Sequence, residues 1–170
     1  IYQELRDQGI NCLCTTYNPL GLLMNFSLLE YPSELNFLDT AYTLSETIQR
    51  LSSKTAPDVI IANIAGGFKS LNSFNSFDMG FLNKIYEEIF FIDFAIVCVP
   101  ANYDPEKVEN DLKYVKAEKI IIGVSDFAMD LATLRNSDGV KSFKASYKTI
   151  QKFKGKISHY TIFDCQEVKQ

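Results

Sequence analysis

Five short apolar runs alternate with segments of helical period along this chain, and this alternation restricts the fold more than any other feature. The run from Asp58 to Ile64 is nearly continuous in β-branched and apolar residues, as expected of a strand covered on both faces. Strands that alternate with helices predict an α/β fold: one open, mostly parallel, five-stranded sheet with helices on both faces, in three layers. The expected strands are Ile10 to Thr16, Asp58 to Ile64, Phe94 to Val99, Ile120 to Val124 and Ile157 to Phe163.

The segments between these runs predict the helices. Apolar residues recur at three- and four-residue intervals from Ser33 to Leu51, with Ser33 as the expected N-cap. Asp104 followed by Pro105 is typical of a helix start. Further helices are expected over Met79 to Phe90, Asp126 to Leu134 and Lys144 to Lys154.

Composition limits the class of protein. A chain of 170 residues with 46% hydrophobic residues can form one compact core, and no repeat or linker interrupts it, so residues 1–170 are expected to be a single domain. Because the first residue is not Met, we expect this domain to be the C-terminal part of a longer protein. The net charge of −4 argues against a nucleic-acid partner. No apolar run is long enough to predict a membrane span, and four irregularly spaced cysteines are typical of a reducing cytoplasm.

Ligands of open parallel sheets bind beyond the carboxyl ends of the strands. Asn63, Gly66 and Gly67 follow the second run, and Asp126 follows the fourth, which makes these four residues candidates for binding a nucleotide or another ligand. The glycines would let the backbone approach a phosphate, or they only form a turn out of the sheet. Asn63 and Asp126 are ligand contacts or loop caps.

Two other segments are candidate partner-binding surfaces. Six lysines and no carboxylate lie between Lys141 and Lys156, and Lys144, Lys148 and Lys152 are spaced four apart, as on one face of a helix. Such a face is solvated, or it docks an acidic peptide or protein. A second segment carries large apolar residues among serines and asparagines, which fold inward or anchor a peptide. These residues are Phe68, Leu71, Phe74 and Phe77.

The chain has no self-sufficient catalytic or metal-binding motif. Cys12 and Cys14 share one face of a strand but have no second ligand pair, so burial is the expected role of both thiols. His159 is the only histidine of the sequence, and packing within the last strand is its expected role rather than that of a general base. These observations point away from an enzyme and predict no metal site.

The segment from Asp58 to Gly67 resembles a strand of P-loop nucleotide-binding enzymes of the dethiobiotin-synthetase kind. In that family an aspartate opens the strand, a glutamate that helps to hold Mg²⁺ occupies the position of Asn63, and Gly-Gly follows. Asn63 is neutral and would hold Mg²⁺ weakly. No Gly-x-x-x-x-Gly-Lys-Ser/Thr loop occurs in the sequence, so the loop either lies upstream of residue 1 or was never present.

The layout of the whole chain also resembles the C-terminal half of clostridial peptide-maturation-system proteins, which accompany radical-SAM enzymes in gene clusters for ribosomally made peptides. This resemblance implies a non-catalytic recognition or accessory domain in the cytoplasm, with a degenerate nucleotide-binding fold, a peptide or protein partner and no cofactor. The alternative is the C-terminal part of an ATP- or GTP-dependent enzyme. Mg-nucleotide would then lie against Asn63, Gly66 and Gly67, with Asp126 on the base side. A third possibility is one structural layer of a larger assembly.

Overall fold

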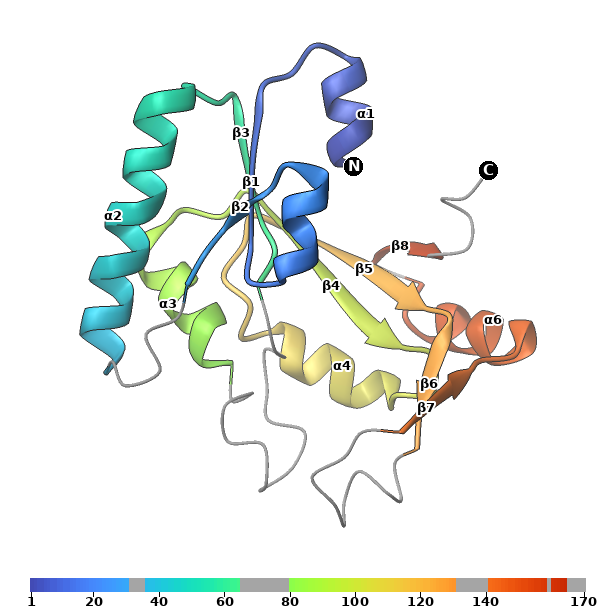
Figure 1. The fold of residues 1–170 in the computed structure, drawn as a ribbon. Helices are drawn as coiled ribbons and strands as arrows, with labels where there is room; N and C mark the ends of the chain where they lie inside the picture. The colour runs from blue at the N-terminus through green and yellow to red at the C-terminus, as the bar shows by residue number, and fades with distance from the viewer. Residues whose placement is uncertain (31–35, 65–79, 131–140, 159, 165–170) are drawn as a thin grey trace. The chain divides into compact units, whose positions relative to one another are not determined.

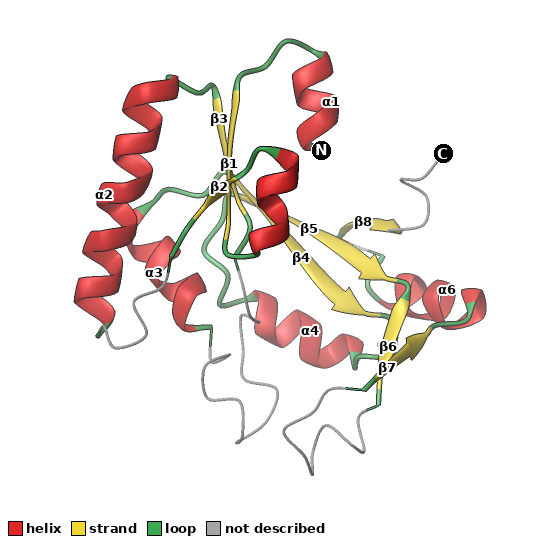
Figure 2. Ribbon diagram, viewed as in Figure 1, coloured by secondary structure: helices red, strands yellow, loops and turns green. Residues whose placement is uncertain are grey.

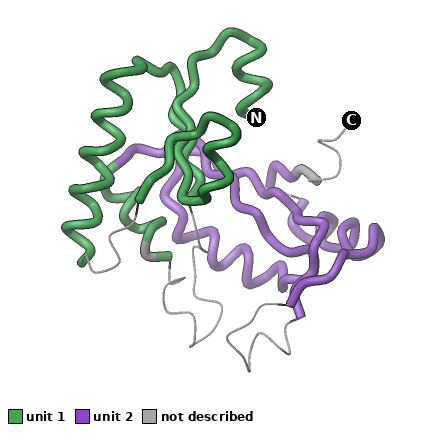
Figure 3. Tube along the Cα trace, viewed as in Figure 1, with its two compact units in different colours: residues 1–67, 80–89 green, residues 68–79, 90–170 purple. Residues whose placement is uncertain are grey.

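A computed structural model describes residues 1–30, 36–64, 80–130, 141–158 and 160–164. The chain divides into two compact units (Figure 3): unit 1 comprises residues 1–67 and 80–89, and unit 2 comprises residues 68–79 and 90–170. The single-domain organisation expected from the sequence stays a prediction, and the units are described separately below.

Unit 1 contains a three-stranded parallel sheet in the order β2-β1-β3 (Figure 2). Its strands are β1 (Cys12–Thr16), β2 (Ser27–Leu28) and β3 (Val59–Ala62). Its helices are α1 (Tyr2–Asp7), the 3₁₀ helix η1 (Pro19–Met24), α2 (Phe37–Thr55) and α3 (Phe81–Ile89). The buried side chains of Leu44 and Ile48 mark the inner face of α2, which lies alongside α3 (Figure 1).

The start of α2 differs from the expected one. Asn36 is the N-cap, because its side-chain oxygen accepts a 3.0 Å hydrogen bond from the backbone N–H of Asp39. Ser33, the expected cap, lies outside the described residues. The apolar period predicted the body of this helix correctly.

Asn11 and Asp58 connect the starts of β1 and β3. The Asp58 carboxylate accepts a 2.9 Å hydrogen bond from the backbone N–H of Asn11, and the Asn11 amide donates at 2.7 Å to the carbonyl oxygen of Thr55. Asp58, the aspartate that opens the strand, therefore has a structural role here.

Unit 2 contains a second three-stranded parallel sheet, in the order β4-β5-β8, and an antiparallel hairpin of β6 and β7. Its strands are β4 (Phe94–Pro100), β5 (Lys119–Ser125), β6 (Phe127–Met129), β7 (Ser142–Lys144) and β8 (Thr161–Asp164). Its helices are α4 (Pro105–Leu112) and α6 (Tyr147–Lys156).

The core of unit 2 lies on one face of its sheet. It joins alternate residues of β4 and β5 to the inner faces of α4 and α6. On the opposite face of β4, Phe94 is 58% exposed and Ile96 is 41% exposed. The core residues that define the buried face are Val97, Val99, Ile122, Val124, Val108, Leu112, Ile150 and Phe153.

The broad α/β prediction is confirmed. A strand forms within each of the five expected runs, and these strands lie in parallel pairs, in one three-stranded sheet of each unit. The last strand begins only at Thr161, because Ile157 is the C-cap of α6. An apolar strand shows that it is covered, but its side chains do not specify which strand lies next to it. The helix expected from Asp126 is also wrong where the structure describes it, because residues 127–129 form β6.

Candidate functional site

The structure places the expected nucleotide-site residues in different units. Asn63 directly follows β3 in unit 1; its side chain is exposed, and its backbone N–H donates a 2.9 Å hydrogen bond to the carbonyl oxygen of Thr15. Asp126 lies between β5 and β6 in unit 2 and is half-buried. Gly66 and Gly67 lie outside the described residues. Within the described ranges, no cluster of three or more His, Cys, Asp or Glu side chains could hold a metal ion.

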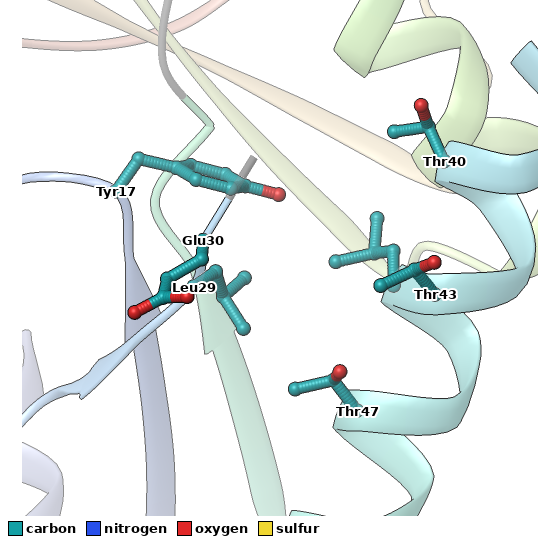
Figure 4. A pocket seen from close by; sticks show the side chains of 7 residues that line it. Tyr17, Leu29, Glu30, Thr40, Thr43 and Thr47 are labelled. Atoms are coloured by element: carbon teal, nitrogen blue, oxygen red, sulfur yellow. The ribbon is translucent and has the colours of Figure 1, made fainter. Parts of the chain in front are cut away.

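The carboxyl ends of β1 and β2 border a small pocket (Figure 4), where Tyr17 faces threonines of α2. The pocket holds about 20 Å³, enough for about one water molecule. The hydroxyl of Tyr17 lies 3.4 Å from that of Tyr86, and burial raises the pKa of Tyr86 above its usual value. The Tyr86 phenol is therefore protonated at neutral pH. The volume of the pocket is too small for a nucleotide.

The cysteines of β1 behave as packing residues. Cys14 is buried and Cys12 is half-buried, and both are free thiols. Burial, with a smaller contribution from the neighbouring Cys12 thiol, raises the pKa of Cys14 to about 11. Cys14 is therefore a neutral thiol near pH 7, which makes it a poor nucleophile and metal ligand. His159 lies outside the described residues.

Three lysines in unit 2, Lys144, Lys148 and Lys152, are exposed, and we call them the lysine surface. Lys148 and Lys152 lie one turn apart on α6, on the side opposite the buried Ile150 and Phe153. Lys144 was expected on the same helix, but it is the last residue of β7, since α6 begins at Tyr147. The expected surface therefore spans a strand end and a helix face.

Acidic residues are absent from the stretch of sequence that contains the lysine surface. The sequence contains no Asp or Glu from Gly139 to Phe163. Within the part of the chain that the structure describes, none of the three ammonium groups forms an ion pair. Each of these three positive charges therefore faces solvent.

The position of Lys148 also conflicts with the dipole of its own helix. The first turn of an α-helix favours anions, and α2 and α4 follow this rule with Asp39 and Glu106. The first turn of α6 contains Lys148 and no acidic residue. Local stability favours an acidic residue here, and departures from local rules concentrate at functional sites.

Sequence reasoning missed three exposed aromatic residues in the hairpin and the helix that carry these lysines. Phe127 is 53% exposed, Phe143 is 55% exposed and Tyr147 is 69% exposed. Phe127 lies directly opposite Lys144 in the β6–β7 hairpin, and Tyr147 is the first residue of α6. The interleaving of aromatic and lysine residues from Phe143 to Lys148 was the available signal, but the expected helices hid it.

The other candidate partner segment cannot be compared with the structure, because Phe68, Leu71, Phe74 and Phe77 lie outside the described residues. Within the described ranges, no helix is both long and apolar enough to cross a membrane. Among known proteins, no family model and no curated protein matches this chain. Its function must therefore be inferred from its own surfaces.

Proposed function

We propose that this chain is a non-catalytic recognition domain that binds an acidic segment of a peptide or protein through the lysine surface. The observation that carries the proposal is the exposure of Lys144, Lys148 and Lys152, with no ion-pair partner among the described residues. An acidic partner would remove the repulsion between these lysines and complement the amino end of α6.

The magnitude of the electrostatic effect sets the expected affinity. An exposed ion pair contributes about 0.2 to 1 kcal/mol, so three pairs contribute roughly 1 to 3 kcal/mol. Charge alone therefore supports steering and weak binding, and tight binding needs further contacts. Under the resemblance to peptide-maturation systems, the partner is a ribosomally made precursor peptide or the enzyme that modifies it.

Titration of the whole chain with a labelled synthetic peptide of Glu and Ser tests this proposal by fluorescence anisotropy at low and high salt. We expect saturable binding that weakens as salt increases, because exposed charges are screened. Reversing all three lysines to Glu should abolish binding. In the matched control variant, three exposed lysines elsewhere are reversed, which changes the net charge by the same amount. This control should bind the Glu and Ser peptide more tightly than the surface variant does. These controls are Lys54→Glu, Lys107→Glu and Lys113→Glu.

Equal loss of binding in the two triple variants would contradict the proposal, because net charge would then account for the whole effect. The absence of binding to the Glu and Ser peptide by the unaltered chain at low salt would also contradict it.

Titration with MgATP and MgGTP distinguishes the recognition domain from the alternative function. That alternative is a nucleotide-dependent enzyme built on one open P-loop-like sheet with helices on both faces. In its favour, polar residues directly follow β3 and β5, as Asn63 and Asp126. Saturable nucleotide binding that Asn63→Ala or Asp126→Ala weakens would favour the alternative over a recognition domain.

A further inference from the structure

We infer that the acidic partner of the lysine surface is amphipathic, and that its apolar side chains dock on Phe127 and Tyr147. This inference rests on the proposed function and adds a second recognition element to it. Charge complementarity selects an acidic segment, and the exposed rings beside the charges select apolar anchors within that segment.

The rings and the charges lie on three elements of unit 2, β6, β7 and α6. Phe127 and Lys144 are directly paired across the antiparallel hairpin, so their side chains lie on the same face of it. Tyr147 and Lys148 then open α6, directly after β7. A bound segment that neutralises Lys144 and Lys148 would therefore pass over the rings of Phe127 and Tyr147.

Hydrogen bonds hold the hairpin that carries Phe127 in place. The Ser125 hydroxyl accepts a 3.1 Å bond from the backbone N–H of Phe127, and the N–H of Ala145 donates at 2.7 Å to the carbonyl oxygen of Asp126. The side chain of Asn102 bonds both backbone groups of Met129. A ring on such a fixed support loses little freedom when a partner covers it, which favours its use as an anchor.

Single-stranded nucleic acid also combines negative charge with flat apolar groups, and aromatic side chains stack on its bases. The observations favour a peptide, because the whole chain carries a net charge of −4, which opposes the binding of a long polyanion. A nucleic-acid partner is therefore an outcome of the test rather than part of the inference.

The test compares two synthetic peptides of equal length and charge, titrated against the whole chain at low and high salt. One contains Glu and Ser, and in the other some Ser residues are replaced by Phe and Leu. We expect the amphipathic peptide to bind about tenfold more tightly, and to retain binding at high salt that the Glu and Ser peptide loses.

Two variants show which residues produce the difference in affinity between the two peptides. Phe127→Ser combined with Tyr147→Ser should remove the tenfold difference while leaving the affinity for the Glu and Ser peptide unchanged. The control is Phe91→Ser, which removes an 80% exposed ring of the same unit and should leave the difference intact. Circular dichroism spectra and thermal midpoints of all variants show whether each remains folded.

The outcomes are distinguishable. Equal affinity for the two peptides, with binding still dependent on the lysine surface, overturns this inference and leaves the proposed function standing. Tighter binding of a thymidine oligonucleotide than of either peptide overturns the inference in favour of nucleic acid. Failure of the unaltered chain to bind either peptide overturns both the inference and the proposed function.

Discussion

The side-chain amide of Asn102 hydrogen-bonds both backbone groups of Met129: it donates at 2.7 Å to the carbonyl oxygen and accepts at 3.0 Å from the N–H. Asn102 follows β4, and Met129 is the last residue of β6. One side chain therefore replaces a missing strand neighbour for the hairpin that carries Phe127. This contact positions the candidate site without taking part in it.

Asn102→Ala should lower the free energy of unfolding by about 1 to 3 kcal/mol, because two half-buried backbone groups lose their partner. Urea unfolding followed by circular dichroism measures the change. Asn102→Asp is the matched control, since its carboxylate can still accept from the N–H of Met129 but cannot donate to the carbonyl oxygen. Its free energy of unfolding should lie between those of the unaltered chain and Asn102→Ala. A value for Asn102→Ala within error of the unaltered chain would show that the double contact contributes nothing.

Lys148→Glu should raise the free energy of unfolding by about 0.5 to 1 kcal/mol in the absence of a partner. The substitution places an anion at the amino end of α6 and converts the i,i+4 repulsion with Lys152 into attraction. Urea midpoints at low salt measure the gain, and Lys148→Gln should give a smaller one.

The same substitution should weaken binding of the Glu and Ser peptide, so stability and recognition change in opposite directions. A solvated surface with no partner predicts the stability gain without the loss of binding. A destabilising effect of Lys148→Glu at low salt would show that the dipole and repulsion arguments are wrong for this helix.

Raising the pH should destabilise unit 1 through Cys14. Burial raises the pKa of this thiol from 9.0 to about 11 in the folded chain, so the unfolded chain releases the proton first. The contribution of Cys14 is fully present below pH 9.0 and is lost as the pH rises towards about 11. Unfolding free energies measured across this window should fall, and they should fall less steeply in a Cys14→Ala variant. If the free energy of unfolding falls equally steeply with pH in the unaltered chain and in Cys14→Ala, the pH dependence does not come from the Cys14 thiol.

The sequence predicted the kinds of elements better than their arrangement. The apolar runs identified β1, β3, β4, β5 and β8, because β-branched segments of this length are favourable only as covered strands. They did not specify the order of the strands or the short strand β2, since strand order depends on contacts distant in sequence. The residues from Phe127 to Met129 were expected in a helix, and three residues are too few for an alternating period to stand out.

The candidate site was predicted in part for similar reasons. Charge is visible in the sequence, and Lys144, Lys148 and Lys152 are exposed as a docking face requires. The exposure of Phe127 and Tyr147 depends on the hairpin and on the start of α6. The sequence assigned Phe127 no role, and its helical period placed Tyr147 on the inner side of the helix with Ile150 and Phe153, whereas Tyr147 is 69% exposed. Asn63 and Asp126 follow their strands as expected, and their role in binding a nucleotide or another ligand stays a prediction.

The edge of β4 that does not pair with β5 is a candidate for association between chains. Within the described residues β5 is its one strand neighbour, and the strand contains no charged residue that would block pairing with another chain. Ile96→Lys places a charge at a 41% exposed position of this strand and should reduce light scattering at high protein concentration. Because the side chain is only partly buried, the free energy of unfolding should change by less than about 1 kcal/mol.

The control Val97→Lys introduces the same charge at a 9% exposed core position and should unfold unit 2. Unchanged scattering of the folded Ile96→Lys variant would show that another surface drives association.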